Sequence, residues 1–184
     1  MKKSLSFILF ISFIFISCEK EQDPYLIGPT NIGMLTKDVK INKLDSVFAQ
    51  DSIVRQVNDD DLYRKNNEIG IYDRQGKKLL LLEPVQAFDS TSTVGFIQVL
   101  DPRFKTAKGL STASTFKDIF ENYNISRIEN TLSAAVIFID DLNAYVTIDK
   151  KQLPAELRYD TQTRIQASQI PDDAKIKYFM IDWD

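Results

Sequence analysis

An internal repeat constrains the fold of this chain more than any other sequence feature. Residues 33–36 (Gly-Met-Leu-Thr) are echoed by residues 109–112 (Gly-Leu-Ser-Thr). After each comes a set of apolar residues spaced by three and four positions, which predicts one face of a short helix. The first set is Ile41, Leu44, Val47 and Phe48, and the second is Phe116, Ile119, Phe120 and Tyr123.

Strand patterns follow each predicted helix in the same order. Apolar runs predict a strand, a hairpin and a final strand in each half. The first set lies at 52–57, 68–74 with 77–85, and 93–101; the second lies at 125–131, 134–139 with 144–149, and 175–182. One such unit is too small to bury both of its faces, so we expect the halves to share a core. The sequence therefore predicts an α+β fold, in which two tandem helix-plus-antiparallel-sheet repeats, 32–108 and 109–184, form one integrated domain.

Two of the predicted strands are dense in apolar residues. The leucines at 79–82 and the aromatic run at 178–183 predict strands that are buried on both faces. The terminal run permits a second interpretation, because Tyr and Trp are enriched in the hot spots of protein interfaces. Tyr178 and Trp183 are therefore the candidate partner-binding residues.

The first residues resemble a bacterial lipoprotein signal. Lys2 and Lys3 precede an apolar stretch, 5–17, that is shorter than the roughly 18 residues needed to span a bilayer. The stretch ends in Ser17-Cys18, with a small residue directly before the only cysteine. This resembles a lipobox, although Phe15 stands where leucine is usual. The alternative is an ordinary secretory signal followed by an incidental cysteine.

The lipobox resemblance implies removal of residues 1–17 and lipidation of Cys18, with palmitate among the acyl chains. Two or three chains anchor a protein far more firmly than one. Residues 18–31 are polar and punctuated by Pro and Gly, which predicts a tether. The acidic residues after Cys18 also resemble export signals of some surface lipoproteins, or belong simply to the tether. We expect a location in the cell envelope, anchored in the outer membrane and facing the periplasm or the exterior.

A wider resemblance rests on the segment 101–110 (Asp-Pro-Arg-Phe-Lys-Thr-Ala-Lys-Gly-Leu) and the helix start at 115–119. Both are similar to segments of uncharacterised Gram-negative envelope lipoproteins. The tandem layout is similar to that of the β-lactamase inhibitory protein. Both resemblances concern structure, and they imply no functional residue for this chain.

The residue counts exclude several kinds of chemistry. The chain has no histidine and one cysteine, so it has no Ser-His-Asp triad, no imidazole metal ligand and no disulfide. Its 26 acidic residues outnumber 23 basic ones, which argues against nucleic acid as a partner. Acidic clusters occur at 59–61, 140–141 and 172–173 without the spacing of a calcium loop, and aspartate is common in turns. We therefore expect no metal and no cofactor.

Two functions are compatible with these observations. The first is a non-catalytic, lipid-anchored module that binds an envelope protein or supports envelope integrity. The second is a small-molecule carrier or an enzyme with a pocket between the two repeats. A concave apolar pocket at the repeat junction favours the second function, and a continuous exposed patch favours the first. No catalytic motif is present, so we expect no enzyme.

Overall fold

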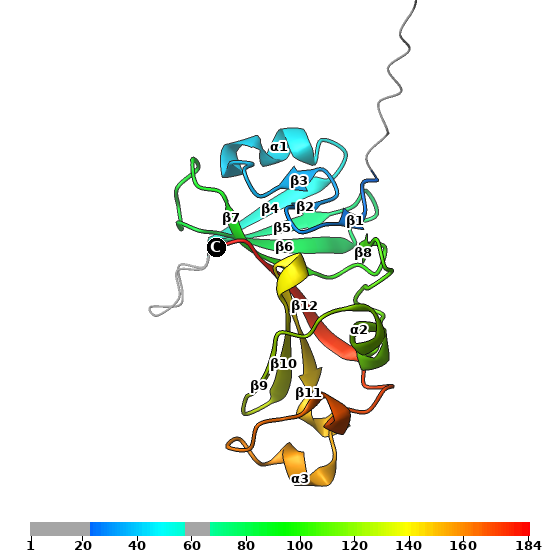
Figure 1. Ribbon diagram of the computed structural model, residues 1–184. Helices are drawn as coiled ribbons and strands as arrows, with labels where there is room; N and C mark the ends of the chain where they lie inside the picture. Colours follow the sequence, from blue (N-terminus) through cyan, green and yellow to red (C-terminus); the bar gives the residue numbers. More distant parts are fainter. Residues whose placement is uncertain (1–22, 58–66) are drawn as a thin grey trace, which may run out of the picture.

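The computed structural model describes residues 23–57 and 67–184 (Figure 1). Its main element is an eight-stranded sheet with the order β4-β5-β6-β7-β12-β11-β10-β9, in which every neighbouring pair is antiparallel. The strands are β4 (Ser52–Val57), β5 (Asn67–Tyr72), β6 (Lys78–Pro84), β7 (Val94–Val99), β9 (Arg127–Asn130), β10 (Ala134–Ile139), β11 (Ala144–Asp149) and β12 (Ile176–Asp182).

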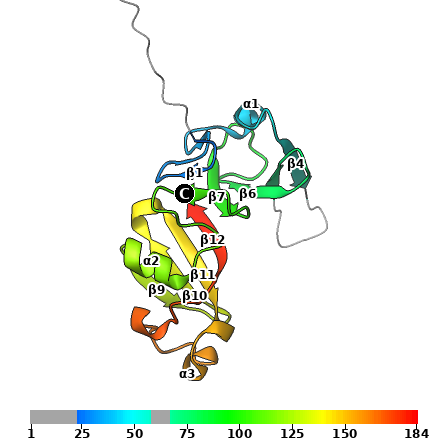
Figure 2. The ribbon, with the colours of Figure 1, turned by 90° about the vertical axis from the view of Figure 1, so that its right-hand side faces the viewer.

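The strand order of the second half of the chain mirrors that of the first. β4 to β7 occupy one half of the sheet and β9 to β12 the other, and the halves join where β7 pairs with β12. In the register of this junction, Val99 is opposite Phe179 and Ile97 is opposite Ile181. In Figures 1 and 2, the direction of β6 makes a steep angle with the directions of β10 and β11. The sheet is therefore strongly twisted between its two ends.

A second, small sheet covers part of the first half. Its order is β3-β2-β1-β8, from β1 (Leu26–Ile27), β2 (Asn31–Ile32), β3 (Leu35–Thr36) and β8 (Lys105–Thr106). β1 and β8 are parallel, with Leu26 opposite Lys105. These strands begin inside the range 18–31 that was predicted to be a tether, because β1 pairs with a segment far along the chain.

The α+β prediction is wrong, because the protein is mostly β. The described helices are short: α1 (Leu44–Val47), α2 (Phe116–Asn122), α3 (Ala155–Arg158), and 3₁₀ turns at Ile41–Lys43, Asp140–Leu142, Lys150–Gln152 and Ala167–Gln169. The predicted repeat of a helix on a sheet is therefore not the architecture of the molecule. Short apolar patterns at helical spacing are marginal helix formers, and here tertiary packing supports only one or two turns. None of these helices has the length and apolarity needed to cross a membrane.

One hydrophobic core holds the two halves together. It lies on one face of the large sheet and contains residues from both halves, including Leu80, Ile97, Ile137 and Phe179. Leu44 of α1 and Ile119 of α2 are fully buried against it. The other face of the sheet remains partly exposed along all its central strands, as an antiparallel sheet permits.

Burial on both faces, predicted for two strands, is wrong for β12 and only partly correct for the leucines. In β12, Phe179 and Ile181 are buried, whereas Tyr178 is exposed and Met180 half-buried. In β6, Leu79, Leu80 and Leu82 are buried and Leu81 is half-buried. A register shift beside Tyr72 makes Leu79 an extra residue in its strand, so two consecutive leucines are buried there.

Candidate binding face and the ion-pair network behind it

We use the name "open face" for the side of the large sheet that turns away from the core. One row of side chains crosses it through direct cross-strand pairs: Leu81, Gln98, Met180, Tyr145, Phe138 and Arg127. Side chains opposite each other on neighbouring strands lie within contact distance. The row is therefore a continuous, largely apolar band from β6 to β9.

The centre of the open face is a shallow hollow of about 370 Å³. It is lined by Gln98, Tyr145, Thr147, Tyr178 and Met180, which belong to β7, β11 and β12, and so it lies where the two halves of the sheet join. Tyr178 is 46% exposed, and the Thr147 hydroxyl is buried without a hydrogen-bond partner. The hollow opens onto the rest of the face and is not an enclosed cavity.

One end of the open face is acidic. A second hollow, of about 230 Å³, is lined by Phe138 and Tyr145 together with three carboxylates, Asp140, Asp182 and Asp184. Burial raises the pKa of Tyr145, and the charges of Asp182 and Glu83 raise it further. The phenol of Tyr145 therefore stays protonated and able to donate a hydrogen bond beside this acidic group.

The structure does not bring Tyr178 and Trp183 together. Tyr178 lies on the open face, whereas Trp183 is partly buried against the core. The backbone N–H of Trp183 donates to the Gly95 carbonyl at 2.8 Å, and its indole nitrogen is buried without a partner in the described part of the chain. Trp183 therefore supports the fold, and Tyr178 is the member of the predicted pair that a partner can reach.

The other aromatic residues of the open face were not predicted from the sequence. The rings of Phe138 and Tyr145 are in contact, tilted by 35° with 5.5 Å between their centroids, and Arg127 covers Phe138 with its guanidinium carbon 3.4 Å from the ring centre. Segments 134–139 and 144–149 are rich in apolar residues at both odd and even positions. This pattern does not indicate which side chains turn away from the core until the register of the strands is known.

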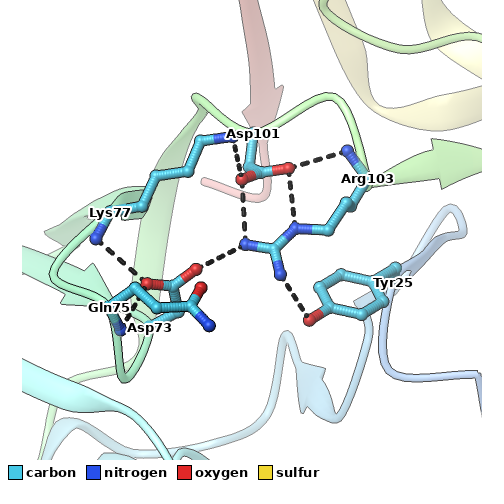
Figure 3. A network of polar contacts seen from close by, with 6 residues as sticks. All are labelled: Tyr25, Asp73, Gln75, Lys77, Asp101 and Arg103. Atoms are coloured by element: carbon cyan, nitrogen blue, oxygen red, sulfur yellow. Dashed lines mark hydrogen bonds and ion pairs between the residues drawn. The ribbon is translucent and has the colours of Figure 1, made fainter.

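At the ends of β5, β6 and β7 that face the small sheet, a network of charged groups links three segments of the chain (Figure 3). Asp101, which is fully buried, accepts hydrogen bonds from the Arg103 backbone N–H (2.8 Å), Nε (3.0 Å) and Nη2 (3.0 Å), and pairs with Lys77 Nζ at 2.8 Å. Arg103 Nη2 also pairs with Asp73 at 2.7 Å, and its Nη1 donates to the Tyr25 hydroxyl at 3.2 Å. The network thus joins the β5–β6 turn, the segment after β7 and the start of the folded chain.

The network holds its carboxylates ionised. Burial alone would raise the pKa of Asp101, but the hydrogen bonds from Arg103 and Lys77 outweigh it and hold that pKa well below its usual range. The hydrogen bond from Arg103 likewise lowers the pKa of Asp73. Both carboxylates are saturated with donors, and neither has the properties of a general base at neutral pH. We therefore assign the network a structural role.

A further hollow, of about 380 Å³, lies beside the network between α1 and the small sheet. Its lining is mainly apolar and includes Tyr25, Met34, Phe48 and Phe104, with Asp51 as its acidic group. Burial raises the pKa of Asp51, and the nearby Asp73 raises it further. No sequence pattern indicated this hollow, and it lies away from the junction between the halves.

The remaining sequence predictions fall in two groups. The predicted signal at 1–17, Cys18 and the acidic cluster at 59–61 lie outside the described residues. Asp140 and Asp141 belong to a 3₁₀ turn that ends at Asn143, whose φ is 48°. Asp172 and Asp173 lie in the turn before β12. Within 23–57 and 67–184, no cluster of acidic side chains has the composition of a metal site.

Comparison with known proteins places the fold but not the activity. No family model matches the chain, and no curated protein has significant sequence similarity to it. Among solved structures, the fold is similar to that of the uncharacterized protein yfeY from Escherichia coli, with a TM-score of 0.55 and 12% sequence identity. The match covers 85% of this chain and 99% of that chain. At this level of identity, the two proteins share a fold, and nothing further about function follows.

Proposed function

We propose that the protein is a non-catalytic lipoprotein of the cell envelope that binds another protein through the open face. The observation that supports this function most directly is the continuous band from Leu81 to Arg127, across a face of the sheet that remains partly exposed among the described residues. A surface of this kind on a folded domain is typical of an interaction site. The alternative, a carrier or enzyme with a pocket between the halves, has less support because the hollow at the junction is shallow.

The composition of the open face suits a protein partner. Tyr145, Tyr178, Phe138 and Met180 supply the large apolar side chains that are enriched at protein interfaces, and Arg127 supplies a planar cation. The carboxylates at one end add electrostatic selectivity, because charges at the rim of an interface favour partners of opposite sign. We therefore expect a partner with basic side chains next to an apolar patch.

Attachment at Cys18 limits where this partner lies. Seven residues separate Cys18 from Leu26, the first residue of β1. A fully extended chain of this length reaches roughly 25 Å. If Cys18 is lipidated as proposed, its acyl chains insert in the outer membrane and the folded domain stays close to the surface of that membrane. The partner is then an envelope protein that is accessible there.

A cross-linking experiment with matched variants tests the open face. Tyr178→Arg places a charge at the centre of the face, and Tyr159→Arg makes the same change at a side chain that is 93% exposed next to α3. Each full-length protein is cross-linked in intact cells and recovered with its partners. We expect Tyr178→Arg to lose a specific cross-linked protein that the wild type and Tyr159→Arg retain.

The outcome is decisive only if the variants fold. Trp183, the single tryptophan, reports folding by its fluorescence because its indole is partly buried. Should Tyr178→Arg, correctly folded, capture the same proteins in the same yield as Tyr159→Arg, the open face is not the binding site. If Tyr178→Arg changed the binding or turnover of a small molecule but captured the same cross-linked proteins as the wild type, the carrier or enzyme would be favoured instead.

A further inference from the structure

A groove of about 360 Å³ lies beside the start of β9, and it is distinct from the two hollows of the open face. One bank consists of residues 124–128 and the other of residues 164–167, and Phe120 and Tyr123 from the end of α2 close one side. The lining includes three isoleucines, Ile125, Ile128 and Ile165, among polar groups. Phe120 is 56% exposed, which leaves a large aromatic ring free at the groove.

No strand of the described residues pairs with the outer edge of β9. β9 is the last strand of the large sheet and pairs on one side with β10, with Ile128 opposite Ile137. In an edge strand, alternate backbone N–H and C=O groups point away from the sheet and offer hydrogen bonds to an added strand. Of the lining residues, Arg127 and Ile128 belong to β9 and residues 124–126 directly precede it, so the groove lies beside the start of this edge.

The opposite bank is held in place by hydrogen bonds. The Asn130 side-chain amide, at the end of β9, donates to the carbonyl oxygens of Asp160 (3.0 Å) and Thr163 (2.7 Å). The Asp160 carboxylate in turn accepts the backbone N–H groups of Gln162 and Thr163 at 2.7 and 2.9 Å. The two banks are therefore preformed, which lowers the entropic cost of binding.

The groove carries positive charge. Arg127 and Arg164 line it, one on each bank. Arg127 pairs with Glu129 at 2.9 Å, whereas Arg164 is exposed and has no carboxylate partner among the described residues. Lys108, with its Nζ 4.8 Å from the centre of the Tyr123 ring, adds a third cation near the same end. An occupant with carboxylates is favoured here, although the chain as a whole is acidic.

We propose that this groove binds an extended, acidic peptide segment of a partner protein, which adds to β9 as a further strand. Main-chain hydrogen bonds to the free edge would supply affinity, and side-chain pockets would supply selectivity, as in other cases of strand addition. Alternate side chains of the segment would contact the three isoleucines, and its carboxylates would meet Arg164. The groove is distinct from the hollows of the open face, although Arg127 lies beside both.

A defined peptide tests the proposal with the full-length protein in non-ionic detergent. The probe is a fluorescein-labelled, N-acetylated heptapeptide in which valine alternates with glutamate, and binding is followed by fluorescence anisotropy. We expect saturable binding, at least tenfold weaker for Arg164→Glu because its free cation is replaced by an anion. The control Lys37→Glu makes the same change of charge at an exposed side chain of another segment and should bind as the wild type does.

Two modified peptides separate strand addition from simple charge attraction. A peptide with lysine in place of glutamate should not bind, and one with N-methyl groups on alternate peptide bonds should bind at least tenfold more weakly, since strand addition needs those N–H groups. Hydrogen exchange should slow at 126–130 when the unmodified peptide is bound.

Four results would overturn the proposal. The first is no saturable binding at peptide concentrations up to about 1 mM. The second is equal binding by Arg164→Glu and Lys37→Glu, and the third is equal binding of the methylated peptide. The fourth is that another occupant covers the edge of β9. A second copy of the chain would form concentration-dependent dimers in which residues 126–130 are protected from hydrogen exchange. A lipid surface would be indicated if phosphatidylglycerol vesicles bound through Arg164 when the peptide did not.

Discussion

Substitution of Asp101 by asparagine tests the central claim about the charged network. Asp101 receives three N–H groups of Arg103 and the ammonium group of Lys77, and none of its surface is exposed. Asparagine has almost the same shape, but one carboxylate oxygen becomes an NH₂ group. This group would face donors, so at least one N–H group of Arg103 or Lys77 would lose its acceptor at a position that is fully buried.

The expected loss of unfolding free energy in Asp101→Asn follows from the burial of the Asp101 carboxylate and not from the number of its contacts. The carboxylate is fully buried, but the side chains of Arg103 and Lys77 are 41% and 56% exposed, so the cations that remain stay solvated. Loss of hydrogen bonds to a buried charged group costs about 1.5–3 kcal/mol. Arg103 keeps Asp73 as a partner at 2.7 Å, which favours the lower end of this range. The matched control is Asp45→Asn, in the exposed Asp45–Arg55 pair at 2.8 Å, where the loss should be less than about 1 kcal/mol.

The pH dependence provides a second check. The folded protein holds the pKa of Asp101 below its unfolded value, so the ionised carboxylate stabilises the fold above that unfolded value, about 3.9. This contribution is lost as the pH falls through the folded pKa. Asparagine does not titrate, so the difference in unfolding free energy between wild type and Asp101→Asn should shrink below about pH 4.

Urea unfolding, followed by the fluorescence of Trp183, measures these differences. At neutral pH we expect a lower midpoint for Asp101→Asn with an unchanged slope. A loss below about 1 kcal/mol would show that the network contributes no more than a surface pair. A loss that stays constant from neutral pH to about pH 3 would show that ionisation of Asp101 is not its cause.

Three further predictions concern the core, a helix cap and the anchor. Leu44→Ala and Ile119→Ala, both at fully buried positions, should each lower the unfolding free energy by about 2–5 kcal/mol in the same urea experiment; a loss below about 1 kcal/mol would contradict their burial. Asp118 is exposed, but its carboxylate accepts the Thr115 N–H at 2.8 Å in a capping box. Asp118→Ala should therefore cost about 1 kcal/mol, and Lys117→Ala on the same helix should cost less. Cys18→Ala should abolish incorporation of labelled palmitate in growing cells, and a wild-type protein that takes up no label would refute lipidation.

The sequence predicts the positions of the strands in this protein better than it predicts which faces of those strands are buried. The predicted hairpin at 134–139 and 144–149 coincides with β10 and β11, and the predicted turn at Gln75-Gly76 joins β5 to β6, where Gly76 has a φ of 78°. Alternation and turn residues are local features, so they are visible without the fold. What packs on a strand is not local, which is why burial of β12 on both faces was predicted incorrectly.

The small sheet and the charged network depend on contacts between distant parts of the chain. β1 and β8 have two residues each and no pattern that identifies them, and their pairing brings Leu26 against Lys105. Asp73, Asp101 and Arg103 meet because the β5–β6 turn lies beside the segment after β7. Proline and glycine in 24–29 are typical of a linker, but this segment is fixed by tertiary pairing.

Arg127 lies on the boundary between the two proposed binding surfaces. It is a lining residue of both the β9 groove and the acidic hollow of the open face, its guanidinium covers Phe138, and it pairs with Glu129 at 2.9 Å. A carboxylate bound to Arg127 in the groove would compete with Glu129 and alter the cation beside Phe138. Occupancy of either surface would then change the affinity of the other by the same factor, because coupling between two binding sites is reciprocal.

Substitution of Arg127 would therefore disturb both surfaces at once, whereas Arg164 lines the groove and neither hollow of the open face. Arg164 is the residue that separates the two functions.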